Sequence, residues 1–149
     1  MPLKPPPPNF FRVLYALGFG PVVGRFVLLL TTRGRKTGLP RVTALQYEEI
    51  EGAIVVGSSR GTKADWFRNI VVDPHVRVRI KLKEFRGLAE PNTDPGRITD
   101  FLEYRLKRHP RMIGAILRSE GMPVPPGRKE LEAYASKIAI VVIRPEQGD

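Results

Sequence analysis

The stretch RGRKTGLPR gathers four cationic side chains within nine residues and contains no acidic residue. The cations are Arg33, Arg35, Lys36 and Arg41. Gly34 and Gly38 allow the backbone to approach a ligand closely and to turn its N–H groups toward it. Because an arginine guanidinium can bind phosphate in a bidentate manner, the stretch predicts a phosphate-binding loop. It is not a Walker loop, because the order Gly, four residues, Gly-Lys-Ser/Thr is missing. An exposed hairpin turn with solvated cations is the alternative.

The composition limits which ligands the chain attracts and which kinds of catalytic or metal site it can form. Twenty-five Lys and Arg against fifteen Asp and Glu give a formal net charge of +10 over 149 residues, and such a field attracts nucleic acid, acidic lipid or a phosphorylated small molecule. The chain has no cysteine, which excludes disulfides, thiolate metal sites and a cysteine nucleophile. Two histidines are too few for a histidine-rich metal site, so we predict no metal.

The loop is expected to lie between two strands, 26–32 and 42–50, followed by a third strand at 53–59. Residues 75–83 (HVRVRIKLK) alternate strictly, with Val76, Val78, Ile80 and Leu82 on one face and Arg77, Arg79, Lys81 and Lys83 on the other. Further strands are predicted at 85–90 and 137–144, and helices at 65–72, from 95 to His109, at 111–119 and at 128–136. Six strands joined by short turns predict a mainly β protein with helical insertions, in which an antiparallel sheet closes into a barrel.

The N-terminal end differs from the rest. Four consecutive prolines predict a flexible arm over residues 1–9, and residues 10–149 are expected to form a single domain. The layout is not that of a secretory signal, so we expect a cytoplasmic protein. Residues 10–30 are largely apolar, but Arg12 and Arg25 interrupt them, so a membrane span is not expected. Peripheral membrane contact through residues 10–30 is an alternative.

Three stretches in order, TTRGRKTGLPRVTAL, VVGSSRGTKADWFRN and VDPHVRVRI, closely resemble the deazaflavin (F-420)-dependent nitroreductase family, also called F-420H2-dependent quinone reductases. The resemblance covers about residues 28–90. It implies a split β-barrel that binds coenzyme F-420, a 5-deazaflavin carrying a phospholactyl group and an oligoglutamate tail. It also implies an oxidoreductase that transfers a hydride from the reduced coenzyme to a quinone, a nitro compound or an activated alkene. The acidic tail would then be the partner of the loop cations.

The resemblance also implies which residues contact the cofactor. The phosphate and the nearby tail would be held by Arg35, Lys36, Thr37, Gly38, Arg41, Val42 and Thr43. Gly57, Ser58 and Ser59 would run along the deazaflavin ring, and Trp66, Phe67 and Asn69 would complete the pocket. This sequence departs from the family pattern at Phe67 and Arg68, where a tyrosine and a histidine are usual. The loss of that phenol bears on the acceptor, which the sequence leaves open.

A hydride acceptor gains negative charge, so a nearby proton donor would assist the reaction. Ser58 and two tyrosines on the helical insertion, Tyr104 and Tyr134, are the candidates, provided that the insertion folds over the mouth of the barrel. Either tyrosine could instead anchor an amphipathic helix.

Three further alternatives stay open. The cofactor could be FMN, as in related split barrels. The chain could be a non-catalytic binder of polyanions that uses the basic face of residues 75–83, although that face lacks the aromatic side chains that stack bases, so no specific nucleic acid is expected. A homodimer is also compatible with the sequence.

Overall fold

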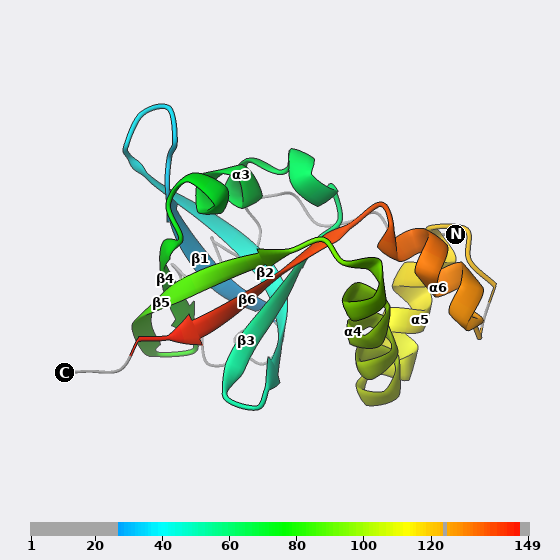
Figure 1. Cartoon of the computed structure of the whole chain (residues 1–149). Helices are drawn as coiled ribbons and strands as arrows, with labels where there is room; N and C mark the ends of the chain where they lie inside the picture. The colour runs from blue at the N-terminus through cyan, green and yellow to red at the C-terminus, as the bar shows by residue number, and fades with distance from the viewer. Residues whose placement is uncertain (1–26, 124, 147–149) are drawn as a thin grey trace.

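The cationic loop is the crest of a β-hairpin. The computed structural model describes residues 27–123 and 125–146, and in it β1 (Val27–Arg33) pairs antiparallel with β2 (Pro40–Ile50). The register joins Arg33 to Pro40, so residues 34–39 form the crest, which extends beyond the rest of the barrel (Figure 1). The predicted arm at 1–9, and residues 10–26 of the segment considered for membrane contact, lie outside the described residues.

The hairpin belongs to a closed six-stranded barrel. The other strands are β3 (Ala53–Ser58), β4 (His75–Ile80), β5 (Lys83–Asn92) and β6 (Ala139–Pro145). They close in the order β1-β2-β3-β6-β5-β4, with every neighbouring pair antiparallel. The predicted fold class, an antiparallel barrel of about six strands with helical insertions, is confirmed.

The barrel interior follows the two-residue period of its strands. In β1, Leu28 and Leu30 are fully buried and pack with residues such as Val56, Val78 and Val141 from the other strands. A short 3-10 helix, η1 (Gly61–Lys63), leads into α3 (Asp65–Val72), which lies across the end of the barrel next to the hairpin (Figure 1). The buried apolar side chains of α3 close the interior at that end; they are Trp66, Phe67 and Ile70.

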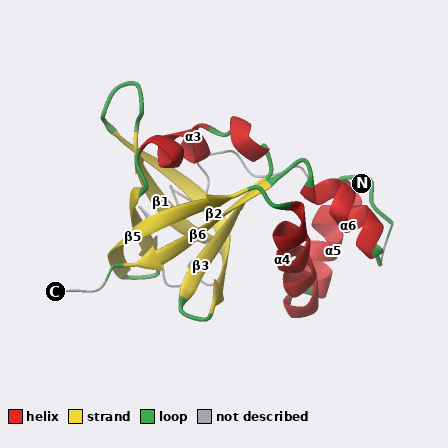
Figure 2. Ribbon diagram, viewed as in Figure 1, coloured by secondary structure: helices red, strands yellow, loops and turns green. Residues whose placement is uncertain are grey.

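The helical insertion covers the outside of the barrel rather than its mouth. It consists of α4 (Pro95–Arg108), α5 (Pro110–Ser119) and α6 (Arg128–Ala135), which gather on one side of the sheet (Figure 2). Their apolar faces pack on outward side chains of β3 and β6, including Val55 and Ile140. The Asp94 carboxylate caps α4, which begins at the predicted residue 95, by accepting a hydrogen bond from the Arg97 N–H at 3.0 Å. No helix of the described residues is long and apolar enough to cross a membrane.

The predicted strand at 75–83 is wrong at its end. β4 stops at Ile80, Lys83 already belongs to β5, and the two residues pair with each other. Between them Lys81 has a φ of 57° and Leu82 is 78% exposed, so the alternation of residue types continues through a tight turn. The four cations of this stretch therefore do not form one row on one strand.

Candidate functional site

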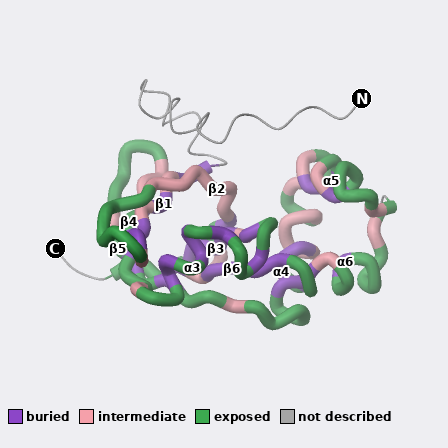
Figure 3. The backbone as a smooth tube through the Cα atoms, turned by 90° about the horizontal axis from the view of Figure 1, so that it is seen from above, coloured by how far each residue is buried: buried purple, intermediate pink, exposed green. Residues whose placement is uncertain are grey.

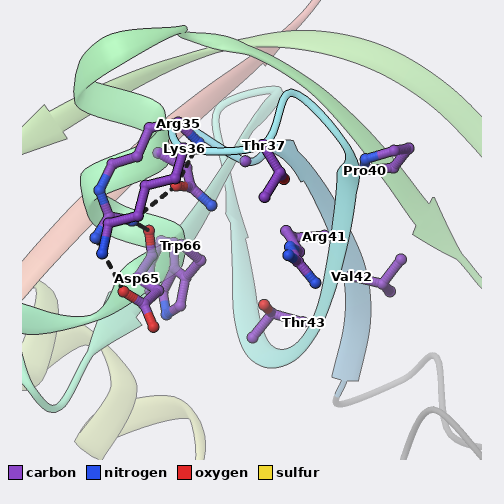
Figure 4. Close-up of a pocket in the computed structure, with 11 residues that line it drawn as sticks. Arg35, Lys36, Thr37, Pro40, Arg41, Val42, Thr43, Asp65 and Trp66 are labelled. Atoms are coloured by element: carbon purple, nitrogen blue, oxygen red, sulfur yellow. Dashed lines mark hydrogen bonds and ion pairs between the residues drawn. The ribbon is translucent and has the colours of Figure 1, made fainter.

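A cavity of about 500 Å³ lies between the hairpin and α3. Its walls come from both sides of the hairpin crest and from the first turns of the helix (Figure 4). Asp65 and Trp66 stand on one side and Arg41, Val42 and Thr43 on the other. The lining residues are Gly34, Arg35, Lys36, Thr37, Pro40, Arg41, Val42, Thr43, Asp65, Trp66 and Asn69.

The structure brings most of the predicted cofactor contacts to this one place. The predicted residues that line the cavity are Arg35, Lys36, Thr37, Arg41, Val42, Thr43, Trp66 and Asn69. The predicted residues that do not line it are Gly38, Gly57, Ser58, Ser59 and Phe67. Three lining residues were not predicted: Gly34, Pro40 and Asp65.

Two glycines determine the shape of the crest. The Gly34 N–H donates to the Leu39 carbonyl at 2.8 Å, and the Gly38 N–H donates to the Gly34 carbonyl at 2.7 Å. A Cβ at Gly34 would lie 2.9 Å from Thr37 Oγ1 and 3.1 Å from the Leu39 carbonyl oxygen. Gly38 has a φ of 72°, a conformation that favours glycine. The tight crest therefore depends on glycine at both positions.

Arg35 ties the crest to α3. Its backbone N–H and its Nη1 both donate to Asn69 Oδ1, at 3.2 and 2.9 Å. Its Nη2 lies 3.1 Å from Asp65 Oδ1. The buried Asn69 side chain also donates from Nδ2 to Thr32 Oγ1 at 3.1 Å, so one amide joins the crest, the helix and β1. These bonds hold the crest in place over the end of the barrel.

Asp65 is the acidic partner that the loop itself lacks. The hydrogen bond from Arg35, reinforced by that guanidinium's charge, lowers the pKa of the Asp65 carboxyl, and the nearby Lys36 and Arg60 lower it further against a small opposing effect of burial. Of the four cations that the sequence leaves unpaired within the loop, Arg35 thus has a partner in the protein itself, while its contact with the cofactor stays a prediction. A helical spacing of four residues places Asp65 and Asn69 on one face of α3, so both side chains can reach Arg35.

Lys36 and Arg41 remain without such a partner. Neither side chain forms an ion pair or a hydrogen bond with any described residue. The backbone N–H groups of Lys36 and Thr37, at the exposed crest (Figure 3), also donate to no acceptor in the described part of the chain. The cavity thus presents two cations that form no ion pair and two unused amide donors, which is the chemistry of an anion site.

The opposite wall is aromatic. The Trp66 side chain lines the cavity although the residue is only 8% exposed, and it packs edge-on against the buried Phe67 with ring centroids 6.2 Å apart. Trp66 is the sole tryptophan of the chain. A planar apolar wall beside an anion site suits a ligand with a phosphate and a ring system.

Comparison with known proteins decides the family. The model of the family described as F420H(2)-dependent quinone reductase matches residues 17–110, which is more than half of the chain. The chain belongs to this family. The resemblance seen in the sequence is confirmed, and the family's dependence on F420H(2) supports coenzyme F-420 rather than FMN as the cofactor.

An individual relative matches over a shorter stretch. The F420H(2)-dependent quinone reductase of Mycobacterium tuberculosis is 34% identical over 67 residues, which are 43% of this chain and 45% of that protein. The chain therefore matches less than half the length of this curated relative.

Solved structures agree on the fold. An F420-H2 dependent reductase superposes with a TM-score of 0.55 at 19% identity, over 80% of this chain and 95% of the other. The haem storage protein HutZ of Vibrio cholerae gives a TM-score of 0.56 at 18% identity, over 83% of this chain and 84% of the other. Proteins described by different ligands thus share the split barrel, so the fold alone does not select the ligand.

The three predicted proton donors of this family member lie away from the cavity. The Ser58 hydroxyl is buried and donates to the Gly61 carbonyl at 2.7 Å. Tyr104 stacks with the Arg108 guanidinium, 5.8 Å from the ring centroid. Tyr134 packs in the helical cluster, where burial, with a smaller contribution from Glu120, raises the pKa of its hydroxyl. None of the three lines the cavity. The two tyrosines belong to the helical insertion, which covers the outer face of β3 and β6, and Ser58 is a buried residue of β3.

Proposed function

We propose that this chain is an F420H(2)-dependent reductase that binds the deazaflavin cofactor in the cavity between the hairpin and α3. The proposal includes a hydride acceptor of the quinone class, with nitro compounds and activated alkenes as the other acceptors to be tested. It is supported by the family match over residues 17–110. A homodimer is part of the proposal as well; a solved structure described as a domain-swapped dimer shares the fold, with a TM-score of 0.55 at 19% identity.

One observation supports this function most directly. The side chains of Lys36 and Arg41 and the backbone N–H groups of Lys36 and Thr37 have no acceptor among the described residues. Arg35, by contrast, is already paired with Asp65. A cavity of about 500 Å³ lies within the usual range for small-molecule sites, roughly 300–1,000 Å³. The residues present therefore fit a ligand that carries both a phosphate and a ring.

Bound in this cavity, the reduced deazaflavin would supply a hydride, so the protein needs no nucleophile of its own. Lys36 and Arg41, with the crest amides, would hold the phosphate. Asn69 and Asp65 fix Arg35 and thereby hold the crest in one conformation before the ligand arrives. Trp66 would exclude water from one wall of the site.

Titration of the protein with coenzyme F-420 and, separately, with FMN tests the proposal. Trp66 lines the cavity and is the sole tryptophan, so its fluorescence should report binding. We expect Lys36→Gln to weaken F-420 binding by about 1.5–3 kcal/mol, the range for a hydrogen bond to a charged group. The matched control is Lys129→Gln, which removes the same charge from the exposed surface of α6.

Equal affinity of the Lys36→Gln and Lys129→Gln variants would contradict the assignment of the crest, and tighter binding of FMN would favour the other cofactor. Optical measurement of the oxidation of the reduced coenzyme, with quinones, enones and nitro compounds as acceptors, then tests catalysis. The absence of turnover with every acceptor, despite binding, would leave a non-catalytic cofactor-binding protein.

A further inference from the structure

A second cavity, of about 490 Å³, lies on the other flank of the hairpin. Its lining residues are Thr31, Thr32, Arg33, Gly38, Pro40, His75, Val76, Arg77, Arg86 and Glu146. Pro40 lines both cavities, so they are neighbours at the base of the crest. The function proposed above uses none of the charged residues of this second cavity.

Three exposed guanidiniums stand close together in it. Arg77 of β4 is the direct partner of Arg86 in the antiparallel β4–β5 pair. On its other side Arg77 pairs with Thr31 of β1, and Arg33 lies two residues further along the same face of β1. Like charges directly opposite each other on neighbouring strands destabilise a sheet. This row of arginines is therefore unfavourable unless an anion compensates it.

The protein compensates these charges only in part: Glu84 lines a smaller neighbouring cavity together with Arg77 and Arg86, and the Asp73 carboxylate interacts electrostatically with Arg33. None of the side chains of Arg33, Arg77 and Arg86 forms an ion pair or a hydrogen bond with a described residue. Glu146 is the one carboxylate of the lining, and its N–H donates to the Arg86 carbonyl at 2.9 Å. His75 is held by Asp73, with Nδ1 2.9 Å from Oδ1. The second cavity therefore has an excess of positive charge directed at solvent.

The chemistry of this cavity differs from that of the crest. Arg33, Arg77 and Arg86 lie on β1, β4 and β5, where most backbone N–H groups are used by the strand ladders. It thus lacks the unused amides that the crest offers to a phosphate. What it offers is a row of planar guanidiniums spaced by neighbouring strands, and each can bind one carboxylate in a bidentate manner.

From this row we infer that the second cavity is a binding site for a polycarboxylate, held by Arg77 and Arg86 with Arg33 at its edge. The carboxylates have two sources. One is an acidic tail on the cofactor, which would pass Pro40 from the first cavity; this source depends on the proposed function. The other is a separate small polycarboxylate that binds without the cofactor.

The test measures binding by isothermal titration calorimetry on the full chain at low and moderate salt. The first probe is free triglutamate. We expect the double variant Arg77→Gln/Arg86→Gln to weaken triglutamate binding about tenfold or more, since two charge-assisted contacts are lost. The control, Arg111→Gln, removes an exposed arginine from the start of α5 and should leave the affinity unchanged. Thermal unfolding checks that all variants fold.

The second probe is the cofactor itself, with and without its glutamates. If the tail is the source, the tailed form binds more tightly than the tailless form, and Arg77→Gln/Arg86→Gln removes this preference while leaving tailless binding intact. A triglutamate response that depends on Arg77 and Arg86, without any effect of the tail, identifies a separate polycarboxylate and still supports the site.

Equal triglutamate affinity of the wild-type protein and the double variant would overturn the inference. This failure is distinguishable from failure of the proposed function, in which the tailless cofactor would not bind in the first cavity and Trp66 fluorescence would not respond. The triglutamate titration is informative in either case, because it does not require the cofactor.

Discussion

Replacement of Asn69 by alanine should destabilise the protein and loosen the hairpin crest. The buried amide accepts from the Arg35 N–H and Nη1 and donates to Thr32 Oγ1. Alanine would remove all three contacts at once, whereas Arg35 would keep its contact with Asp65. The variant therefore isolates the role of the amide from that of the ion pair.

The magnitude follows from the types of bond lost. A hydrogen bond to a charged group contributes about 1.5–3 kcal/mol and a neutral one about 1 kcal/mol, and a buried partner left unsatisfied adds to the loss. Because Arg35 is partly solvated and keeps Asp65, we expect the free energy of unfolding to fall by about 2–3 kcal/mol. In a chain of this length that corresponds to a decrease in Tm of about 5–10 °C.

Urea denaturation followed by Trp66 fluorescence and by circular dichroism measures this change. The matched variant is Asn69→Asp, which keeps an acceptor for Arg35 and allows the Thr32 hydroxyl to donate instead, so it should lose much less stability. Affinity for the cofactor should fall in Asn69→Ala as well, since the crest is no longer fixed. A loss below about 0.5 kcal/mol, the usual range for surface changes, would refute the reasoning, as would equal losses in both variants.

Three further predictions concern other parts of the same architecture. Glu48→Gln should lower the free energy of unfolding by about 3 kcal/mol, because the buried carboxylate lies 3.4 Å from Arg105 and a neutral amide would leave that guanidinium with a hydrogen bond to Gln46 but without a counter-charge; a thermal melt unchanged from wild type would contradict this. Gly34→Ala should cost about 1–2 kcal/mol by overpacking the crest and should weaken cofactor binding, measured by denaturation and titration, whereas wild-type values in both would contradict the close approach. The Arg35–Asp65 contact stabilises the fold at pH values above the ordinary carboxyl pKa, and this stabilisation is lost as the pH falls below about 4 and through the lowered pKa of Asp65. Asp65→Asn should therefore make the free energy of unfolding less dependent on pH in the acid range. Parallel pH profiles of stability for the wild-type protein and the variant would contradict this prediction.

Local patterns in the sequence predicted most of the fold. The apolar strands at 53–59 and 137–144 and the helix that begins at residue 95 lie where short-range rules place them, because their periods and boundaries are properties of adjacent residues. Reliance on local patterns also explains why the turn at Lys81 and Leu82 was not predicted. Alternation of residue types continues through it, and a non-glycine residue with positive φ carries little signal in the sequence.

The residues of the candidate site also fall into those that local sequence predicts and those that it does not. Arg35, Lys36 and Arg41 follow from their density in one loop, whereas Trp66 and Asn69 come from the family resemblance. The pairing of Arg35 with Asp65 spans 30 residues of chain, and no local rule predicts which carboxylate a loop cation will meet. The position of the helical insertion also depends on which barrel face is apolar, which is why Tyr104 and Tyr134 were expected at the mouth.

The different surroundings of the cations explain how one loop can be both ordered and available to a ligand. A cluster of like charges on a flexible crest would lose binding energy to the ordering of the loop on association. Here Arg35 is ordered without a ligand, because Asp65 and Asn69 bind its side chain and fix the crest against α3. Lys36 and Arg41 then keep their charge for an incoming anion, and the ordering cost is met on folding rather than on binding. Replacement of Asn69 should therefore weaken cofactor binding, although Asn69 is not one of the two cations expected to contact the phosphate.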